Sequence, residues 1–435
     1  MSRKYAEAPW ADDLLAYIGR SPTPWHAAAS AVKRFEEAGF ESLDEDEAWS
    51  LKPGHGYYVV RDSSSVIAFR VGEQPPTQSG YRMVGAHTDS PGLRLKPKPQ
   101  MIKGGWETLT AEVYGGPILV TFADRDLTLA GRLAVRESGN VATRLFHHPE
   151  PLVRIPNLAI HMNRSVNDEG LKFDTATELA ALFDQVDTPL TAESGFEAWL
   201  CDQAGLDTRE LLGFELALCD TQPGRRYGPR GEFLSTGQLD NLTSTHAAIE
   251  ALCAAEGAMP TGVVALFDHE EIGSESYKGA GGTFLQDVIA RIAHGLDLGT
   301  DEQRRALARS WLVSADTAHA YHPNFPGYYD DENTVRANGG PAIKINAKQR
   351  YATDVVGEAF FAELCQRLEV PVQKYVHRVN LPCGSTIGPI SAARLGVRTI
   401  DIGSPIWGMH SIRESGGALD QDYLVRALGG FLEGA

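Results

Sequence analysis

Four apolar segments of this sequence lead into residues of the types that bind divalent metal ions. These residues and the segments before them are His87 after 83–86, Glu270 and Glu271 after 263–267, Asp316 after 312–315, and His410 beyond 400–409. Short apolar runs are typical of buried strands in a parallel sheet, and ligands of such sheets lie beyond the carboxyl ends of the strands. We therefore expect these side chains to meet at one edge of a single sheet.

This set of residue types favours a pair of divalent ions. Imidazole and carboxylate ligands without cysteine suit zinc, manganese or cobalt in a hydrolytic site. The carboxylates Asp240, Glu271 and Asp316 would leave two ions with one residual positive charge, whereas a single ion would be left with excess negative charge. Two ions can share a carboxylate and a water, and they lower the pKa of that water. Of two adjacent carboxylates, one can bind a metal while the other acts as a base.

The elements that must position these residues change character twice along the chain. Residues 1–92 and 235–435 alternate predicted helices with apolar strands, which is typical of an α/β fold. From residue 93 to about 135 the sequence consists of short alternating runs punctuated by glycine and proline, which is typical of antiparallel sheet. Polar helical patches follow between 175 and 212, and a Pro/Gly/Arg-rich linker at 223–231 leads back, so we assign 93–234 to an insert. We predict a catalytic α/β domain in two parts, with a mixed, largely parallel sheet flanked by helices, and an inserted β-rich domain between the parts.

Composition excludes several classes of partner. A net charge of −17 disfavours nucleic acid and anionic membrane, because both require a basic surface. No run approaches the about 18 apolar residues that span a membrane. The five cysteines are scattered and odd in number, which argues against a disulfide framework and a thiolate zinc site. With no apolar signal core at the start of the sequence, we expect a cytoplasmic protein.

Five motifs occur in order along nearly the whole chain and together form a specific signature. They are Gly85–Pro91, Asp240-Asn241, Phe267–Ser274, Ser314–His319 and Met409–Glu414, joined by Ile343–Tyr351 and Pro382–Pro389. With these motifs the sequence resembles the M18 family of metallo-aminopeptidases, the aspartyl aminopeptidases. The resemblance implies the α/β/α sandwich of zinc peptidases, with the insert acting as a dimerisation domain.

The resemblance also implies the roles of the site residues. One ion, most often zinc, is held by His87, Asp240 and Asp316, and the second by Asp240, Glu271 and His410, so that Asp240 bridges them. Asp89 orients the ring of His87, as carboxylates commonly do behind metal-bound imidazoles. Glu270 is the general base that takes a proton from the bridging water. A bland alternative for Asp240 is a simple helix N-cap.

Substrate recognition and assembly follow from the same resemblance. Lys344 matches the cation that would bind an acidic first residue, with an ordinary surface lysine as the alternative. His319, His322 and Tyr351 lie on stretches that line the same site, and His161 resembles a histidine that reaches into the partner subunit's site. The substrates would be peptides with a free N-terminus, and the assembly a homododecamer built from dimers.

One departure from the family pattern concerns the substrate pocket. An acidic residue usually precedes the Pro-Cys-Gly stretch, and this chain has Val379-Asn380-Leu381 there. The sequence therefore predicts a dinuclear aminopeptidase for N-terminal Asp or Glu, and three alternatives remain. These are the same mechanism with a preference for neutral residues, a non-catalytic assembly protein, and a dinuclear deacylase or carboxypeptidase.

Overall fold

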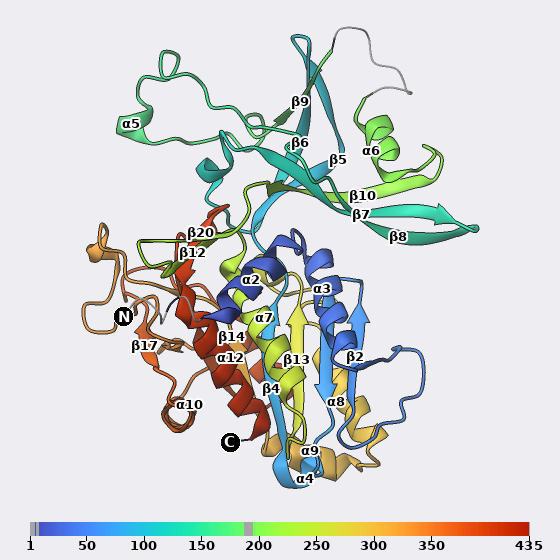
Figure 1. Cartoon of the computed structure of the whole chain (residues 1–435), viewed down its shortest axis with the longest axis vertical. Coiled ribbons are helices and arrows are strands. Elements are labelled where there is room, and N and C mark those ends of the chain that lie inside the picture. The colour runs from blue at the N-terminus through green and yellow to red at the C-terminus, as the bar shows by residue number, and fades with distance from the viewer. Residues whose placement is uncertain (1–4, 6–7, 187–194, 435) are drawn as a thin grey trace. The chain divides into compact units, whose positions relative to one another are not determined.

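A computed structural model describes residues 5, 8–186 and 195–434. The chain divides into two compact units (Figure 1). The first comprises Met1–Asp89, Gly224–Met409 and Glu414–Ala435, and the second comprises Ser90–Pro223 and His410–Arg413. The return to the first unit comes earlier than the predicted boundary at 234. The reason is that β11 (Arg225–Tyr227) pairs with β12 (Phe233–Thr236), which in turn pairs with β20 (Glu414–Gly417) of the first unit.

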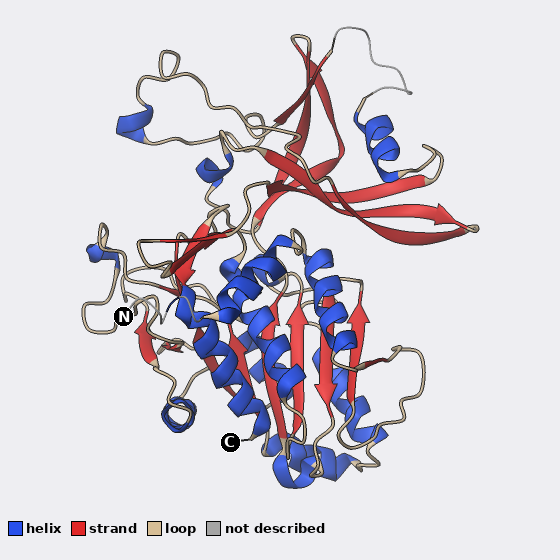
Figure 2. Ribbon diagram, in the orientation of Figure 1, coloured by secondary structure: helices blue, strands red, loops and turns tan. Residues whose placement is uncertain are grey.

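The first unit is built on a nine-stranded mixed sheet (Figure 2). Its order is β1 (Glu41–Ser42), β2 (Gly56–Arg61), β3 (Ser65–Arg70), β13 (Thr261–Phe267), β4 (Tyr81–His87), β14 (Trp311–Ala315), β18 (Arg398–Gly403), β16 (Ala342–Ile345) and β17 (Gln373–Val376). The four central strands, β13, β4, β14 and β18, are mutually parallel. The predicted mixed, largely parallel sheet is confirmed.

Helices cover both faces of this sheet, and the alternation of side chains along the strands explains why. Val264 and Leu266 of β13 belong to one apolar core, whereas Val263, Ala265 and Phe267 belong to another. The first core packs under α2 (Pro9–Gly19), α3 (Pro24–Glu37), α7 (Leu239–Ala254), α10 (Val355–Arg367) and α12 (Ala418–Glu433). The second packs under α8 (Phe284–Gly295), α9 (Thr300–Ala308) and α11 (Ile387–Leu395). A strand apolar on both sides therefore ends up fully buried, as the sequence predicted.

Shorter elements complete the first unit. A five-stranded sheet has the order β11, β12, β20, β19 (Pro405–Trp407) and β15 (Ala318–His319). The short helices are α4 (Pro76–Ser79) and the 3₁₀ turns η2 (Glu270–Ile272) and η3 (Pro326–Tyr328). Among the described residues, no helix has both the length and the apolar character needed to cross a membrane.

The second unit is the β-rich insert. Its six strands pair antiparallel throughout, in the order β8 (Asn140–His147), β7 (Leu127–Glu137), β10 (Leu211–Asp220), β5 (Gly92–Lys103), β6 (Trp106–Tyr114) and β9 (Ala181–Gln185). Within the described part of this unit, short helices are η1 (Leu119–Phe122), α5 (Val166–Glu169) and α6 (Phe196–Ala204). The unit has an apolar core of its own, which includes Ile412 from the separate segment 410–413.

Candidate metal centre

The ends of β4 and β13 lie side by side and set the position of the site. In the parallel register of the two strands, Phe267 is the partner of His87. The chain after Phe267 turns sharply through His269, whose φ is +65°, into the turn η2 that carries Glu270 and Glu271. The carboxylates therefore follow the strand next to the one that ends in the imidazole, as the sequence predicted for a single sheet edge.

His87 lies at the centre of a group of carboxylates. Its Nδ1 is 3.0 Å from the main-chain oxygen of Asp89, so Nδ1–H donates, and Nε2 is the nitrogen left to bind a metal when the ring is neutral. Nε2 lies 3.5 Å from Oδ1 of Asp240, 3.7 Å from Oδ1 of Asp316 and 4.0 Å from Oε2 of Glu270. Tetrahedral zinc ligands at ordinary bond lengths are about 3.4 Å apart. The three predicted ligands His87, Asp240 and Asp316 therefore fit a divalent ion in type and in spacing.

The electrostatics of this group are those of a site that lacks positive charge. Burial lowers the pKa of His87, but the neighbouring carboxylates of Asp240, Asp316 and Asp89 more than reverse this and hold the pKa well above its usual value. Burial raises the pKa of Glu270 to about 8, and neighbouring carboxylates add to the shift although His87 opposes it. Several buried carboxylates around one imidazole are stable only with a cation or with extra protons.

Asp89 acts on more than His87. Its Oδ1 is 3.5 Å from Nδ1 of His87, farther than its own main-chain oxygen. Its two carboxylate oxygens instead accept the backbone N–H groups of Glu270 at 3.1 Å and Glu271 at 3.2 Å. The sequence predicted an orienting role toward the ring, and the structure adds the turn that carries both glutamates.

The predicted ligands of the second ion lie in different units. Glu271 belongs to the first unit. One of its carboxylate oxygens lies within 4.8 Å of a ring nitrogen of His87 and of a carboxylate oxygen of Glu270. His410 belongs to the second unit, where its Nδ1 lies 2.9 Å from the main-chain oxygen of Gly116. That contact places the hydrogen on Nδ1 and the lone pair on Nε2, the form that binds metals. The role of His410 as a ligand stays a prediction.

Asp240 is not a helix N-cap. The residue before α7 is Gln238, and Asp240 and Asn241 have non-helical backbone angles inside the helix bounds. The N–H of Asp240 donates to Oε2 of the buried Glu414 at 2.9 Å. From the sequence Glu414 was interpreted as ordering the loop after His410 through an ion pair with Arg413, and its contact with Asp240 was not predicted.

The first turns of α7 are tied to the strands that carry the other ligands. Nδ2 of Asn241 donates to the main-chain oxygen of Ala315, at 2.9 Å, just before Asp316. Oγ1 of Thr245 donates to the main-chain oxygen of His87 at 2.8 Å. These hydrogen bonds hold the three segments that carry Asp240, Asp316 and His87 in one arrangement. The spacing of the residues along the sequence did not predict these bonds.

Lys344 is buried, so the alternative of a surface lysine is wrong. Its exposed fraction is 3%. The ammonium donates to the main-chain oxygen of Thr317 at 2.8 Å, lies 3.4 Å from Oδ2 of Asp316 and sits 4.8 Å from the centre of the Tyr351 ring. The structure thus brings Lys344 and Tyr351 together beside a predicted metal ligand.

The three histidines predicted to contact substrate differ in burial and in their surroundings. Burial lowers the pKa of His319 to about 4, and the charge of Lys344 adds to this, so the ring is neutral near pH 7. His322 is half-buried, and its ring lies 4.8 Å from that of Phe325. His161 is an exposed residue of the second unit. Its predicted role in a partner subunit stays a prediction.

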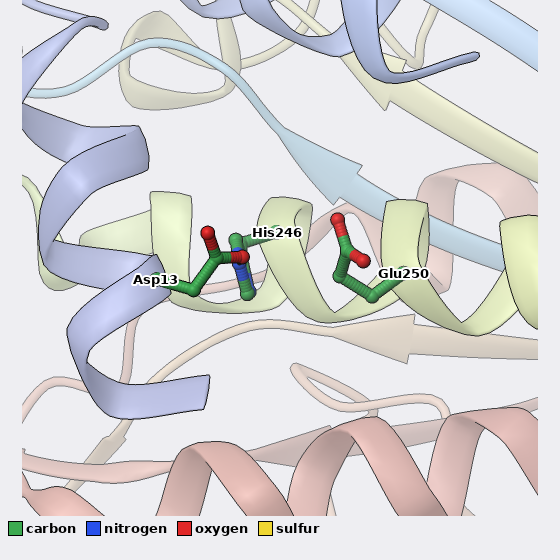
Figure 3. A group of neighbouring side chains, drawn as sticks. All are labelled: Asp13, His246 and Glu250. Atoms are coloured by element: carbon green, nitrogen blue, oxygen red, sulfur yellow. The ribbon is translucent and has the colours of Figure 1, made fainter. Parts of the chain in front are cut away.

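A second group of metal-binding residue types lies elsewhere in the first unit (Figure 3). His246 and Glu250 of α7 face Asp13 of α2, with Nε2 of His246 2.8 Å from Oδ2 of Asp13. Here the chain supplies its own cation, because Arg34 of α3 is hydrogen-bonded to Asp13 and to Glu250. Gln421 of α12 donates to Nδ1 of His246 at 2.8 Å. We interpret this group as a polar link between four helices and not as a metal site.

Comparison with known proteins gives consistent matches. A family model described as Aminopeptidase I zinc metalloprotease (M18) matches residues 17–432. A relative from Pseudomonas paraeruginosa, "Probable M18 family aminopeptidase 2", is 46% identical over 420 residues, which are 96% of each chain. A relative of the same name from Stutzerimonas stutzeri is 45% identical over 426 residues, 97% of each chain.

Solved structures agree with these relatives. The chain matches a structure described as "Cryo-EM structure of the Ape4 and Nbr1 complex" with a TM-score of 0.94 and 39% identity, covering 99% of this chain and 86% of the other. It matches the S. cerevisiae mApe1 dodecamer with a TM-score of 0.84 and 28% identity, covering 97% and 95%. An M18 aminopeptidase from Thermotoga maritima shares the fold, with a TM-score of 0.87 at 21% identity.

Gly403 at the end of β18 allows the close approach of the Asp316 main chain. A Cβ at this position would lie 1.9 Å from the oxygen of Asp316. We predict that Gly403→Ala displaces Asp316, lowers the stability by about 1–3 kcal/mol, and weakens zinc binding in titrations. The control is Gly429→Ala, where a Cβ meets nothing within 4 Å. Zinc affinity equal to that of the wild type in Gly403→Ala would contradict this account.

The polar link around His246 predicts a dependence of stability on pH. Burial lowers the pKa of His246, and the hydrogen bond with His246 lowers the pKa of Asp13. The folded chain thus binds fewer protons than the unfolded chain, so acidification lowers the free energy of unfolding. The contribution of His246 is lost as the pH falls below its ordinary value of 6.5, and that of Asp13 below 3.8.

Urea unfolding at several pH values between about 8 and about 5 measures this effect. His246→Gln should flatten the loss of stability on acidification, whereas the exposed His294→Gln should leave it as in the wild type. An equal slope in all three proteins would show that His246 does not carry it.

Proposed function

The chain belongs to the M18 family of zinc metallo-aminopeptidases, and we propose that it releases N-terminal aspartate or glutamate from peptides. The observation that carries the acidic preference is Lys344. It is a buried cation, 3.4 Å from Asp316, at the edge of the group formed by the predicted metal ligands. A pocket with a fixed, buried cation binds a substrate carboxylate far more tightly than it binds an apolar substrate side chain.

We propose two ions per subunit. His87, Asp240 and Asp316 would hold the first, and Asp240, Glu271 and His410 the second, with zinc as the metal and manganese or cobalt as alternatives. When bound, such a pair supplies Lewis acidity that lowers the pKa of a shared water and neutralises the oxyanion of the tetrahedral intermediate. The excess of buried carboxylates around His87 supports this proposal, because it needs more positive charge than the first unit supplies there.

Glu270 is the proposed general base. Its carboxylate lies 4.0 Å from the imidazole of His87, and its backbone N–H is held by Asp89 at 3.1 Å. It takes one proton from the water as the oxygen adds to the first peptide carbonyl. It then gives that proton to the leaving amine as the C–N bond breaks. Asp89 keeps the base and the ligand Glu271 at a fixed separation, because one carboxylate accepts both of their N–H groups.

Lys344, Tyr351 and His319 are proposed to form the pocket for the first side chain. The ammonium would pair with the substrate carboxylate, and the ring of Tyr351 excludes water from that contact. His319 is neutral near pH 7 and can donate a hydrogen bond without adding charge. His322 is proposed at the margin of this pocket, and His161 as a contribution from a neighbouring subunit.

We also propose a homo-oligomer, a dodecamer built from dimers, that works in the cytoplasm without nucleic acid or membrane. The S. cerevisiae mApe1 structure matched above is a dodecamer, which supports this assembly. The second unit exposes large apolar side chains, among them Val141 at 71% and Met162 at 75%. Burial of these side chains against a second subunit would favour association.

A second candidate function has the same mechanism with a preference for neutral first residues. It is favoured by the contacts that Lys344 already makes. The ammonium is hydrogen-bonded to the oxygen of Thr317 at 2.8 Å and lies near Asp316, so part of its charge is used within the protein. In that case Lys344 would hold Asp316 and would not face a substrate carboxylate.

Hydrolysis of matched Asp-, Glu- and Leu-terminated reporter amides tests the proposed reaction. The zinc-loaded wild type should cleave the acidic substrates best, and chelation should abolish cleavage. Glu270→Gln should lower kcat by about 100-fold or more, because a general base contributes about 10²–10⁴. The exposed Glu275→Gln is the matched control and should behave as wild type. If Glu270→Gln cleaves as fast as the wild type, the assignment of the base is wrong.

Lys344→Met separates the two candidate preferences. A hydrogen-bonded charge in a pocket contributes about 1.5–3 kcal/mol, so the ratio of kcat/KM for Asp over Leu should fall about 10- to 100-fold. Lys344→Arg should keep part of the ratio, and the exposed Lys348→Met should keep all of it. A uniform loss of rate on every substrate, with the ratio unchanged, would favour the neutral preference.

A further inference from the structure

Lys278 is a buried lysine in the segment between β13 and α8. Its exposed fraction is 4%. The ammonium lies 2.7 Å from Oδ2 of Asp62, 2.9 Å from Oγ of Ser64 and 2.9 Å from Oδ2 of Asp268. The contact with Asp268 is an ion pair and not a well-aligned hydrogen bond. A lysine is seldom buried this deeply unless its charge is paired, and here two carboxylates pair it.

Asp268 connects this lysine to the turn that carries the proposed base. It is fully buried and is the first residue after β13. Its Oδ1 accepts the N–H of His269 at 2.8 Å, and its own N–H donates to Oγ of Ser65 at 2.9 Å. Ser65 in turn donates to the main-chain oxygen of Lys278 at 2.9 Å. Both the main chain and the side chain of Lys278 therefore reach the start of the turn.

The turn is fixed from two sides. Asp89 accepts the N–H groups of Glu270 and Glu271, and Asp268 accepts the N–H of His269. His269 adopts a left-handed conformation, with φ of +65°, which a non-glycine residue keeps only when its surroundings enforce it. The Asp268 side of this arrangement depends on a buried negative charge whose partner is Lys278.

Lys278 is charged in the fold. Burial lowers the pKa of its ammonium, but Asp268 and Asp62 more than offset this, and the pKa is raised above its ordinary value. Without the ammonium, Asp268 would be a buried carboxylate without its counter-charge, which is strongly unfavourable. It could be relieved by a shift of Asp268 toward solvent, and such a shift would move the turn and the two glutamates that follow.

We propose that Lys278 is a positioning residue for the hydrolysis reaction, acting through Asp268 to fix the turn that carries Glu270 and Glu271. This inference rests on the proposed function, in which Glu270 is the base and Glu271 a metal ligand. Lys278 itself touches neither substrate nor metal. Its effect should therefore appear in the rate of the chemical step and in zinc affinity, with little change in substrate binding.

Steady-state kinetics of Lys278→Met, Lys278→Arg and the control Lys33→Met test this role. Lys33 is an exposed lysine whose partner is Glu37. We expect Lys278→Met to lower kcat about 10- to 100-fold with KM nearly unchanged, Lys278→Arg to recover part of the loss, and Lys33→Met to match the wild type. A proportional rise in KM with unchanged kcat would overturn the proposal.

A double-mutant cycle with Glu270→Gln separates positioning from a general loss of structure. If Lys278 acts through Glu270, adding Lys278→Met to Glu270→Gln should lower kcat little further. Independent effects would multiply, and that result would overturn the proposal. If Lys278→Met does not fold, Lys278→Gln takes its place in the cycle, because it removes the charge that faces Asp268 but keeps a polar group beside Asp62 and Ser64.

Zinc titration gives a readout that does not depend on hydrolysis. Lys278→Met should weaken the binding of zinc by about 10-fold, since loss of a group that positions a metal ligand typically costs about 10–100-fold in affinity. A wild type that binds zinc but cleaves no peptide would overturn the proposed function, and the titration alone would then decide the positioning role. Unchanged zinc affinity together with unchanged kcat would overturn it.

Discussion

The arrangement of the first unit depends on the convergence of carboxylates on one imidazole at the end of β4. Nε2 of His87 lies 3.5 Å from Asp240, 3.7 Å from Asp316 and 4.0 Å from Glu270, and all three carboxylates are largely shielded from water. Carboxylates this close together repel one another, so the fold must hold them in place. Three features oppose this repulsion. The strands β13, β4 and β14 pair in parallel register, the first turns of α7 are hydrogen-bonded to β14, and Asp89 accepts hydrogen bonds from the turn after β13.

Buried charges in this unit are of two kinds, and the difference supports the proposed metal site around His87. Asp13 and Glu250 are paired with Arg34, and Asp268 is paired with Lys278, so these groups carry their own counter-charge. In the group around His87, Lys344 lies 3.4 Å from Asp316. Groups of the first kind hold helices and turns, whereas the second kind calls for a cation from outside the chain.

The central strands and most of the candidate ligands could be predicted from the sequence, because the positions at which buried strands end follow from the apolar pattern. The runs before His87, Glu270 and Asp316 are apolar on both faces, and parallel strands deliver their ends to one edge. The contacts of Glu414 and Lys278 could not be predicted, because each joins residues far apart in the chain through one hydrogen bond or ion pair. The non-helical start of α7 was also hidden, since an aspartate before an apolar helix has the same pattern as an N-cap. The burial of Lys344 depends on the pairing of β16 with β17 and β18, which the sequence pattern alone does not determine.

The segment 410–413 belongs to the second unit although the chain on both sides of it belongs to the first. Ile412 lies in the apolar core of the insert, and its N–H donates to Oγ1 of Thr121 at 3.0 Å. During synthesis on the ribosome, residues 90–223 emerge long before these four residues do. The core of the insert therefore stays incomplete until residues 410–413 have also been synthesised. The first unit also needs residues 414–435, so the two units are completed one shortly after the other.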